Sequence, residues 1–117
     1  MIDEKAQDLG RLIGQTEEYK ALKRGSERLR EDAECQRLLT DMEKLAGEIE
    51  AMARTGKEPT PAQTEQYDKA VQSIQVSPVY QQMAVAQANF EKLMAKVNSR
   101  IYEGIQKVAA SPIITLG

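Results

Sequence analysis

The sequence contains no histidine and only one cysteine among its 117 residues. Histidine is the side chain that most often serves as general base or metal ligand near neutral pH, so its absence argues against most hydrolytic and metal-dependent chemistry. The single cysteine, Cys35, excludes an internal disulfide and any metal site built from several cysteines of one chain. Catalysis by carboxylates alone would need a preorganised cleft, which a thin helical bundle rarely offers. The sequence therefore favours a protein without catalytic activity.

Recognisable chemical motifs are also missing. The chain has no glycine-rich phosphate loop, no nucleophile elbow and no metal-ligand spacing. Two carboxylate pairs, Glu17 with Glu18 and Asp41 with Glu48, have the character of ordinary acids on helix surfaces. We therefore predict no catalytic residue, no metal and no cofactor.

Long apolar runs and a strong charge imbalance are absent as well. No apolar run approaches the roughly 20 residues that span a bilayer, and the start MIDEKAQDLG is charged where a signal peptide needs an apolar stretch. With 16 basic and 18 acidic residues, the net charge of −2 gives no general attraction to nucleic acid or anionic lipid. We expect a cytoplasmic protein that does not insert into membranes and does not contact nucleic acid directly.

What the sequence does contain is a long amphipathic helix from Ser77 to Ala110. Ser77 is a suitable N-cap, Pro78 suits the first helical position, and Ser111-Pro112 stops the helix. Apolar residues recur along one face at spacings of three or four. They are Val79, Met83, Ala86, Phe90, Leu93, Val97, Ile101, Ile105 and Val108. A helix cannot bury such a stripe against itself, so this one needs a partner.

The residues before Asp32 read as two shorter helices. The first covers residues 2 to 13, where Asp3 and Glu4 favour the helix dipole. The second begins at the cap Thr16 and is expected to bend at Gly25-Ser26.

A third helix begins at Asp32 and ends at Gly56. Its interior Gly47 is expected to mark a close helix crossing, because glycine there costs about 1 kcal/mol against alanine. Its apolar seam consists of Leu38, Met42, Leu45, Ile49 and Met52.

A linker follows at residues 56 to 61, GKEPTP. The fourth helix starts with a capping box made of Thr60, Pro61 and Gln63, and it ends before Ser77. These short connections favour antiparallel packing of the third helix against the last. The apolar residues after Pro112 are expected to dock or to fray.

These elements predict one all-α domain over residues 1–117, an antiparallel long-helix hairpin with short additional helices. Two paired helices leave part of each wide apolar stripe uncovered, which is unusual in a monomer. We therefore expect a helical bundle completed by oligomerisation, as a homodimer, a homotetramer or a hetero-oligomer with a paralogue. The predicted interface lies on the last helix and comprises Met83, Phe90, Leu93, Met94, Val97, Ile101 and Ile105.

Two other features have a functional and a plain interpretation. The first is a basic row on the second helix, which consists of Lys20, Lys23, Arg24 and Arg28. This row could bind an anionic partner, but the same pattern is expected of a solvated helix face whose charge is balanced by acids. Cys35 lies near the positive end of a helix dipole, which would activate a thiol, yet Glu31, Asp32 and Glu34 surround it in sequence. The plain interpretation is favoured for both.

The order of these features resembles the YlbF/YmcA family of small all-helical bacterial proteins. The resemblance covers Ile2 to Ile105 and consists of helix patterns with fixed breaks. The matching positions are Glu18-Tyr19, Leu22, Leu29, Asp32, Leu38-Leu39, Pro59, Pro61, Pro78, Phe90, Val97-Asn98 and Ile101.

The resemblance implies a helical protein that forms homo- or hetero-oligomers and has no enzymatic activity of its own. Characterised relatives act with a partner protein, YaaT, in control of competence, sporulation and biofilm formation, and their complex promotes messenger RNA processing by a membrane endoribonuclease. Some relatives carry cysteines towards the C-terminus that help to hold iron–sulfur clusters. This chain departs from that pattern, because Cys35 is its only cysteine.

The leading hypothesis is therefore a regulatory adaptor subunit that acts through an oligomeric surface. A second hypothesis is a nucleic-acid-associated factor that uses the basic row, extended by Lys92, Lys96 and Arg100. A third is a small chaperone-like helical clamp that binds unfolded chains through an uncovered stripe. The identity of any protein partner does not follow from the sequence.

Overall fold

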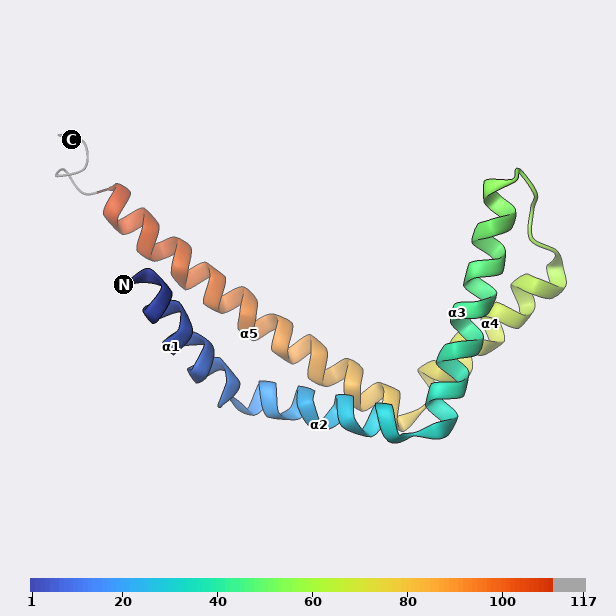
Figure 1. Cartoon of the computed structure of the whole chain (residues 1–117), viewed down its shortest axis with the longest axis horizontal. Helices are drawn as coiled ribbons and strands as arrows, with labels where there is room; N and C mark the ends of the chain where they lie inside the picture. The colour runs from blue at the N-terminus through green and yellow to red at the C-terminus, as the bar shows by residue number, and fades with distance from the viewer. Residues whose placement is uncertain (111–117) are drawn as a thin grey trace.

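A computed structural model describes residues 1–110, which form five α-helices and no strand within that range (Figure 1). The prediction of an all-α fold is confirmed. The expected apolar tail beyond Pro112 lies outside the described residues. The helices are α1 (Ile2–Gly14), α2 (Glu17–Glu31), α3 (Ala33–Arg54), α4 (Pro61–Gln75) and α5 (Pro78–Ala109).

The helices begin where local capping residues place them. The Thr16 hydroxyl accepts a hydrogen bond from the Tyr19 N–H at 3.2 Å, and a reciprocal capping box between Thr60 and Gln63 starts α4. Pro61 and Pro78 occupy the first turns of α4 and α5, where a missing N–H is tolerated. All of these starts were predicted from the sequence.

The five helices form two arms that meet at an elbow, which gives the molecule the shape of a V (Figure 1). In the α5 arm, α1 and α2 run antiparallel along α5. In the hairpin arm, α3 and α4 pack against each other. The radius of gyration is 21.8 Å, whereas a compact chain of this length would have about 13 Å. The chain is therefore extended, and each arm is only two helices thick.

The expected pairing of the two long helices was wrong. α3 packs against α4 rather than α5, and α5 packs mainly against α2 instead. The physical reason lies in the connections. The linker at residues 56–60 turns α4 back onto α3, and the backbone is extended at Asp32 and Ser77, where the chain passes between the two arms.

The elbow is held by the most deeply buried side chains of the described residues. Cys35 is 1% exposed and Ile74 is 2% exposed. The Cys35 Sγ lies 3.1 Å from the Ser77 Oγ. Asp32 accepts the Cys35 N–H at 2.8 Å, and Ser77 caps α5 through the Tyr80 N–H. The starts of α3 and α5 are therefore tied to each other at one point.

The sequence predicted a close helix crossing at Gly47, but the crossing lies at Gly25. A Cβ built on Gly25 would lie 3.3 Å from the Cα of Met83, so α2 and α5 approach closely there. A Cβ on Gly47 would meet nothing within 4 Å. The expected bend at Gly25-Ser26 does not interrupt α2, which is helical from Glu17 to Glu31. Gly56 ends α3 as predicted and has a φ of 75°.

Candidate functional site

The first part of the predicted interface on α5 is half-buried inside the chain. Met83 lies over Gly25, and its Sδ accepts a hydrogen bond from the Ser26 hydroxyl at 3.5 Å. The ring of Phe90 is tilted by 57° against that of Tyr19, with centroids 5.9 Å apart. This part of the stripe joins α5 to α2, so its first role is to hold the α5 arm together.

The middle of the predicted interface faces a shallow groove. Leu93 and Val97 line it together with Leu9 of α1, and Lys96 and Arg100 lie at its edges. The groove has a volume of about 440 Å³. Met94, on the same stripe, is half-buried. Here α1 covers the stripe only partly.

The end of the stripe is exposed. Ile101 is 46% exposed and Ile105 is 57% exposed, and of the two only Ile101 lines the groove beside Leu9. Large apolar residues that the sequence analysis had not assigned to the interface are exposed as well. They are Met1, Ile2, Leu12, Tyr19, Val76, Val85, Tyr102 and Val108. We call Ile101, Ile105 and Val108 the α5 tip, and it is the apolar surface of this stripe that stays open to another molecule.

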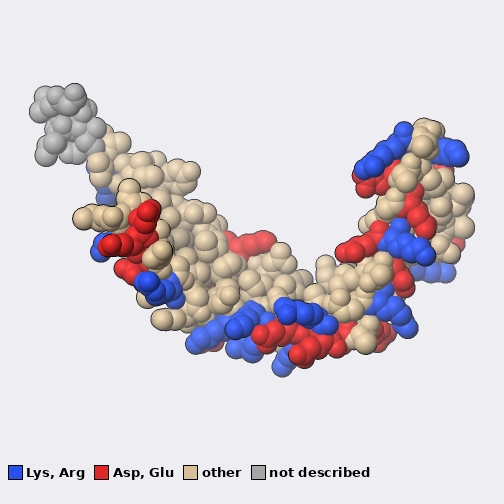
Figure 2. Space-filling model, viewed as in Figure 1, with Lys and Arg blue, Asp and Glu red and all other residues tan. Residues whose placement is uncertain are grey.

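The basic row does not form a patch of one sign. Lys20, Lys23, Arg24 and Arg28 are all exposed on α2, as the sequence predicted for a helix face. Lys20 lies 3.8 Å from a Glu17 carboxylate oxygen, and Arg28 donates to the Gln82 side chain at 2.8 Å. Figure 2 shows blue and red side chains interleaved along the outer side of the V. This interleaving weakens any attraction to a polyanion.

The elbow cysteine is enclosed rather than presented to solvent. A small cavity of about 280 Å³ near Cys35 is lined by Asp32, Glu34, Leu38, Ser73, Val76, Ser77, Pro78 and Val79. At 1% exposure the thiol is inaccessible in the folded chain. Its observed contacts are those of a packing residue.

Other chemistry-bearing clusters are lacking in the part of the chain that the structure describes. No group of three or more His, Cys, Asp or Glu residues there could hold a metal ion. Asp41 and Glu48 line an open groove between α3 and α4 together with Lys44 and Lys69. No helix within residues 1–110 has both the length and the apolar character to cross a bilayer.

Comparisons with known proteins agree with this architecture. The model of the family described as "Control of competence regulator ComK, YlbF/YmcA" matches residues 2–106. A UPF0342 protein of Streptococcus mutans serotype c (strain ATCC 700610 / UA159) is 27% identical over 104 residues, which is 89% of this chain and 92% of that protein.

Two solved structures have a similar fold. A chain of the crystal structure of Bacillus subtilis RicA in complex with RicF superimposes with a TM-score of 0.82 at 19% identity, over 92% of this chain and 96% of that chain. A protein of unknown function (DUF964) from Bacillus stearothermophilus has a TM-score of 0.65, also at 19% identity, over 95% and 97% of the two chains.

Proposed function

The chain belongs to the YlbF/YmcA family, and from this premise we propose that it is a non-enzymatic regulatory adaptor subunit that works as an oligomer. The observation that carries the proposal is the amount of apolar surface left open. Among the described residues only Cys35, Ile74 and Ala86 are buried apolar side chains, whereas α1 and α5 expose large ones. Exposed apolar surface on this scale is typical of a protein that is completed by another chain.

Two further observations support the adaptor role. A chain with the same fold was determined within a complex of two proteins, RicA and RicF. The groove beside Leu9 is lined mainly by apolar side chains, a composition that suits contact with another protein. By the family resemblance, the regulated processes are competence, sporulation or biofilm formation, through messenger RNA processing.

In this proposal the predicted interface has two roles. The α5 arm is held together by Met83, Phe90 and Leu93, which are half-buried. The α5 tip is exposed and remains free to bind a second chain. That second chain is another copy or a paralogue of the same family. The tip is apolar and unstrained, so a partner helix could pack on it without rearrangement of this fold.

The test is the mass in solution, measured by light scattering for the wild type and for a tip variant. Ile101→Asp with Ile105→Asp places two charges on exposed positions, so the helix itself should persist. Gln106→Asp, also exposed on α5, is the matched control. We expect a wild-type mass that is a multiple of 13.1 kDa, and a loss of self-association or of binding to a co-expressed paralogue in the tip variant only.

A wild-type chain that is monomeric at all micromolar concentrations, alone and with the paralogue, would contradict the adaptor proposal. The alternative of nucleic-acid binding through the basic row is tested separately by titrating RNA at increasing salt. Because binding through phosphate contacts releases counterions, its affinity must fall steeply with salt. Negligible binding at low salt removes that alternative, and steep binding that is lost in Lys23→Glu with Arg24→Glu favours it.

A further inference from the structure

A long groove runs along the α5 arm, between α5 and the helices that cover it. One hollow, of about 510 Å³, lies between the start of α2 and the middle of α5. It shares Ala21 and Asn89 with a second hollow of about 430 Å³, and it shares Leu93 and Lys96 with the groove beside Leu9. The three hollows are therefore continuous, and we call them together the arm groove.

The arm groove is long and lies on one side of α5. The α5 residues that line it extend from Pro78 to Ile101. At about 1.5 Å per residue, this distance is about 35 Å. Val85, Asn89 and Lys96 follow one another by one and by two helical turns, so they point to the same side of the helix. A shape of this kind suits an elongated segment better than a small ligand, whose sites are enclosed.

The floor of the arm groove is apolar and its rims are polar. Ala86 is 6% exposed, and Ala21, Leu93 and Val97 are half-buried. The rim side chains of α5 are exposed, and they are Gln82, Asn89, Lys92, Lys96 and Arg100. At the two ends of the floor apolar surface stays open, because Val85 is 62% exposed and Ile101 is 46% exposed. An apolar floor between polar rims is the arrangement by which grooves bind amphipathic helices.

The rims carry more positive than negative charge. The lining of the three hollows contains two acids, Glu17 and Glu18, and four bases, which are Arg24, Lys92, Lys96 and Arg100. The Glu17 carboxylate lies 3.8 Å from the Lys20 ammonium, so its charge is partly offset within α2. A groove with this excess of bases attracts acidic side chains.

Lys92 and Lys96 are the bases most available to a partner. Arg100 already forms an ion pair with Glu103 at 2.9 Å. No carboxylate of residues 1–110 lies within 4.0 Å of the Lys92 or Lys96 ammonium. The two lysines are one helical turn apart and repel each other weakly, so an acid placed between them would relieve that repulsion.

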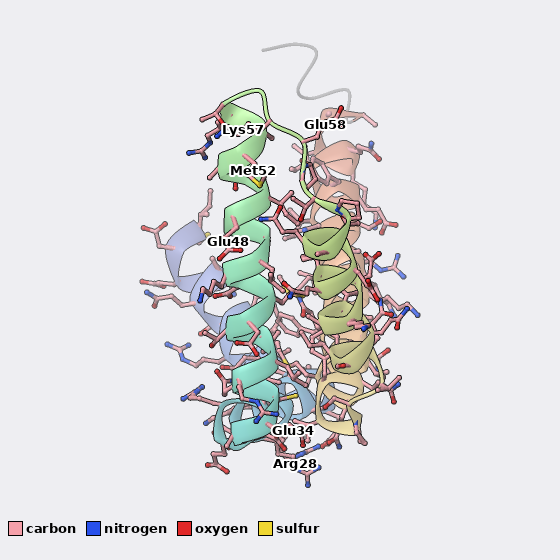
Figure 3. The ribbon with its side chains drawn as sticks, turned by 90° about the vertical axis from the view of Figure 1, so that its right-hand side faces the viewer. Arg28, Glu34, Glu48, Met52, Lys57 and Glu58 are labelled. Carbon is pink, nitrogen blue, oxygen red and sulfur yellow. The ribbon has the colours of Figure 1, made fainter. Side chains whose placement is uncertain are left out.

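The groove of the hairpin arm has a different rim. Asp41 and Glu48 line it together with Lys44 and Lys69. Glu48 lies on α3, and Glu58 lies in the linker that follows (Figure 3). From the start of α3 to the end of α4, the hairpin arm contains eight acids and five bases. An acidic helix is therefore attracted to the α5 arm and repelled by the hairpin arm.

We propose that the arm groove binds an amphipathic helix of another protein, with the apolar face of that helix on the floor and its acidic residues over Lys92 and Lys96. The proposal rests on the adaptor function and names the chemistry of the protein that the adaptor recruits. A helix of about 20 residues is about 30 Å long and fits within the length of the groove. The α5 tip remains the surface for a second copy or a paralogue, and Ile101 belongs to both surfaces.

The probe for this proposal is a synthetic amphipathic peptide of about 20 residues, with leucine and alanine on one helical face and glutamate along both edges of that face. Its twin carries lysine in place of every glutamate. Fluorescence anisotropy measures the binding of each labelled peptide to the full chain at low salt. We expect the acidic peptide to bind about tenfold more tightly than the basic one. This preference should shrink as salt is added.

The floor is tested by Val85→Ser, which removes an apolar contact and leaves the charge unchanged. Val85 is 62% exposed, so the substitution should not affect folding, which circular dichroism verifies. The matched control is Val76→Ser, at a position that is 73% exposed and lies outside the arm groove. We expect Val85→Ser to weaken binding of the acidic peptide about fivefold and Val76→Ser to leave it unchanged.

The rim is tested by Lys92→Glu with Lys96→Glu, which turns the excess of bases into an excess of acids. This exchange should reverse the preference, so that the basic peptide binds more tightly than the acidic one. The control is Lys23→Glu with Lys57→Glu, which changes the net charge equally at exposed positions outside the arm groove. The control should keep the preference of the wild type. A purely structural role of Lys92 and Lys96 would not produce the reversal.

The possible results separate the arm groove from the oligomeric adaptor function. Equal binding of the two peptides, binding of neither, or a preference that Lys92→Glu with Lys96→Glu does not reverse overturns the proposal. If light scattering shows that this exchange dissociates the wild-type assembly and its control does not, a second copy occupies the groove, and the proposal is also overturned. A monomeric wild type that shows the expected peptide preference contradicts the oligomeric adaptor and supports the arm groove.

Discussion

Replacing Gly25 and Gly47 by alanine, one at a time, should change stability in opposite directions although both glycines lie inside helices. Alanine has a helix propensity about 1 kcal/mol better than glycine, and this gain applies at both positions. At Gly47 a new Cβ would meet nothing within 4 Å, so the gain remains. We expect Gly47→Ala to raise the free energy of unfolding by about 1 kcal/mol.

At Gly25 the added methyl meets backbone. It would lie 3.3 Å from the Met83 Cα and 3.4 Å from the Met83 Sδ. The sulfur can move, but the Cα can move only if α5 shifts away from α2. Overpacking of this kind costs about 1–3 kcal/mol, which offsets or exceeds the propensity gain. We expect Gly25→Ala to be destabilising by up to about 2 kcal/mol relative to the wild type.

The assay is urea unfolding followed by far-UV circular dichroism at one fixed protein concentration, because self-association links stability to concentration. The quantity of interest is the difference between the two variants, about 1–3 kcal/mol in favour of Gly47→Ala. Equal stabilisation by both substitutions would refute the close crossing of α2 and α5. Destabilisation by Gly47→Ala would show that another chain occupies the space beside α3.

Three further predictions test individual contacts. Phe90→Ala removes a ring that packs against Tyr19 and should lower the free energy of unfolding by about 2 kcal/mol in the same urea assay. Ile105→Ala, at 57% exposure, should change the free energy of unfolding of the isolated chain by less than about 0.5 kcal/mol. Equal effects of the two substitutions would contradict the conclusion that the apolar stripe of α5 is packed at its beginning and exposed at its end. Thr60→Ala breaks the capping box and should cost about 1 kcal/mol, with faster amide exchange confined to the first turns of α4; unchanged exchange there argues against the cap. The Cys35 thiol should react with a disulfide reagent far more slowly in the folded chain than in urea, and equal rates would show that the elbow is open.

The candidate surface was partly predictable from the sequence. The spacing of apolar residues placed Met83, Phe90 and Ile105 on one stripe of a long helix, and the structure places them on one helix. The stripe alone could not show that α2 covers its beginning and leaves its end exposed, because hydrophobic burial has no preferred partner.

The sequence by itself determined where each helix begins and that the fold is all-α. Caps and prolines such as Thr16, Pro61 and Pro78 act within a few residues of themselves, so their effect can be read locally. Only the tertiary structure decided which helices pair and that the arms diverge. That choice depends on contacts between residues distant in sequence, such as Gly25 with Met83 and Cys35 with Ser77, and no local pattern encodes such contacts.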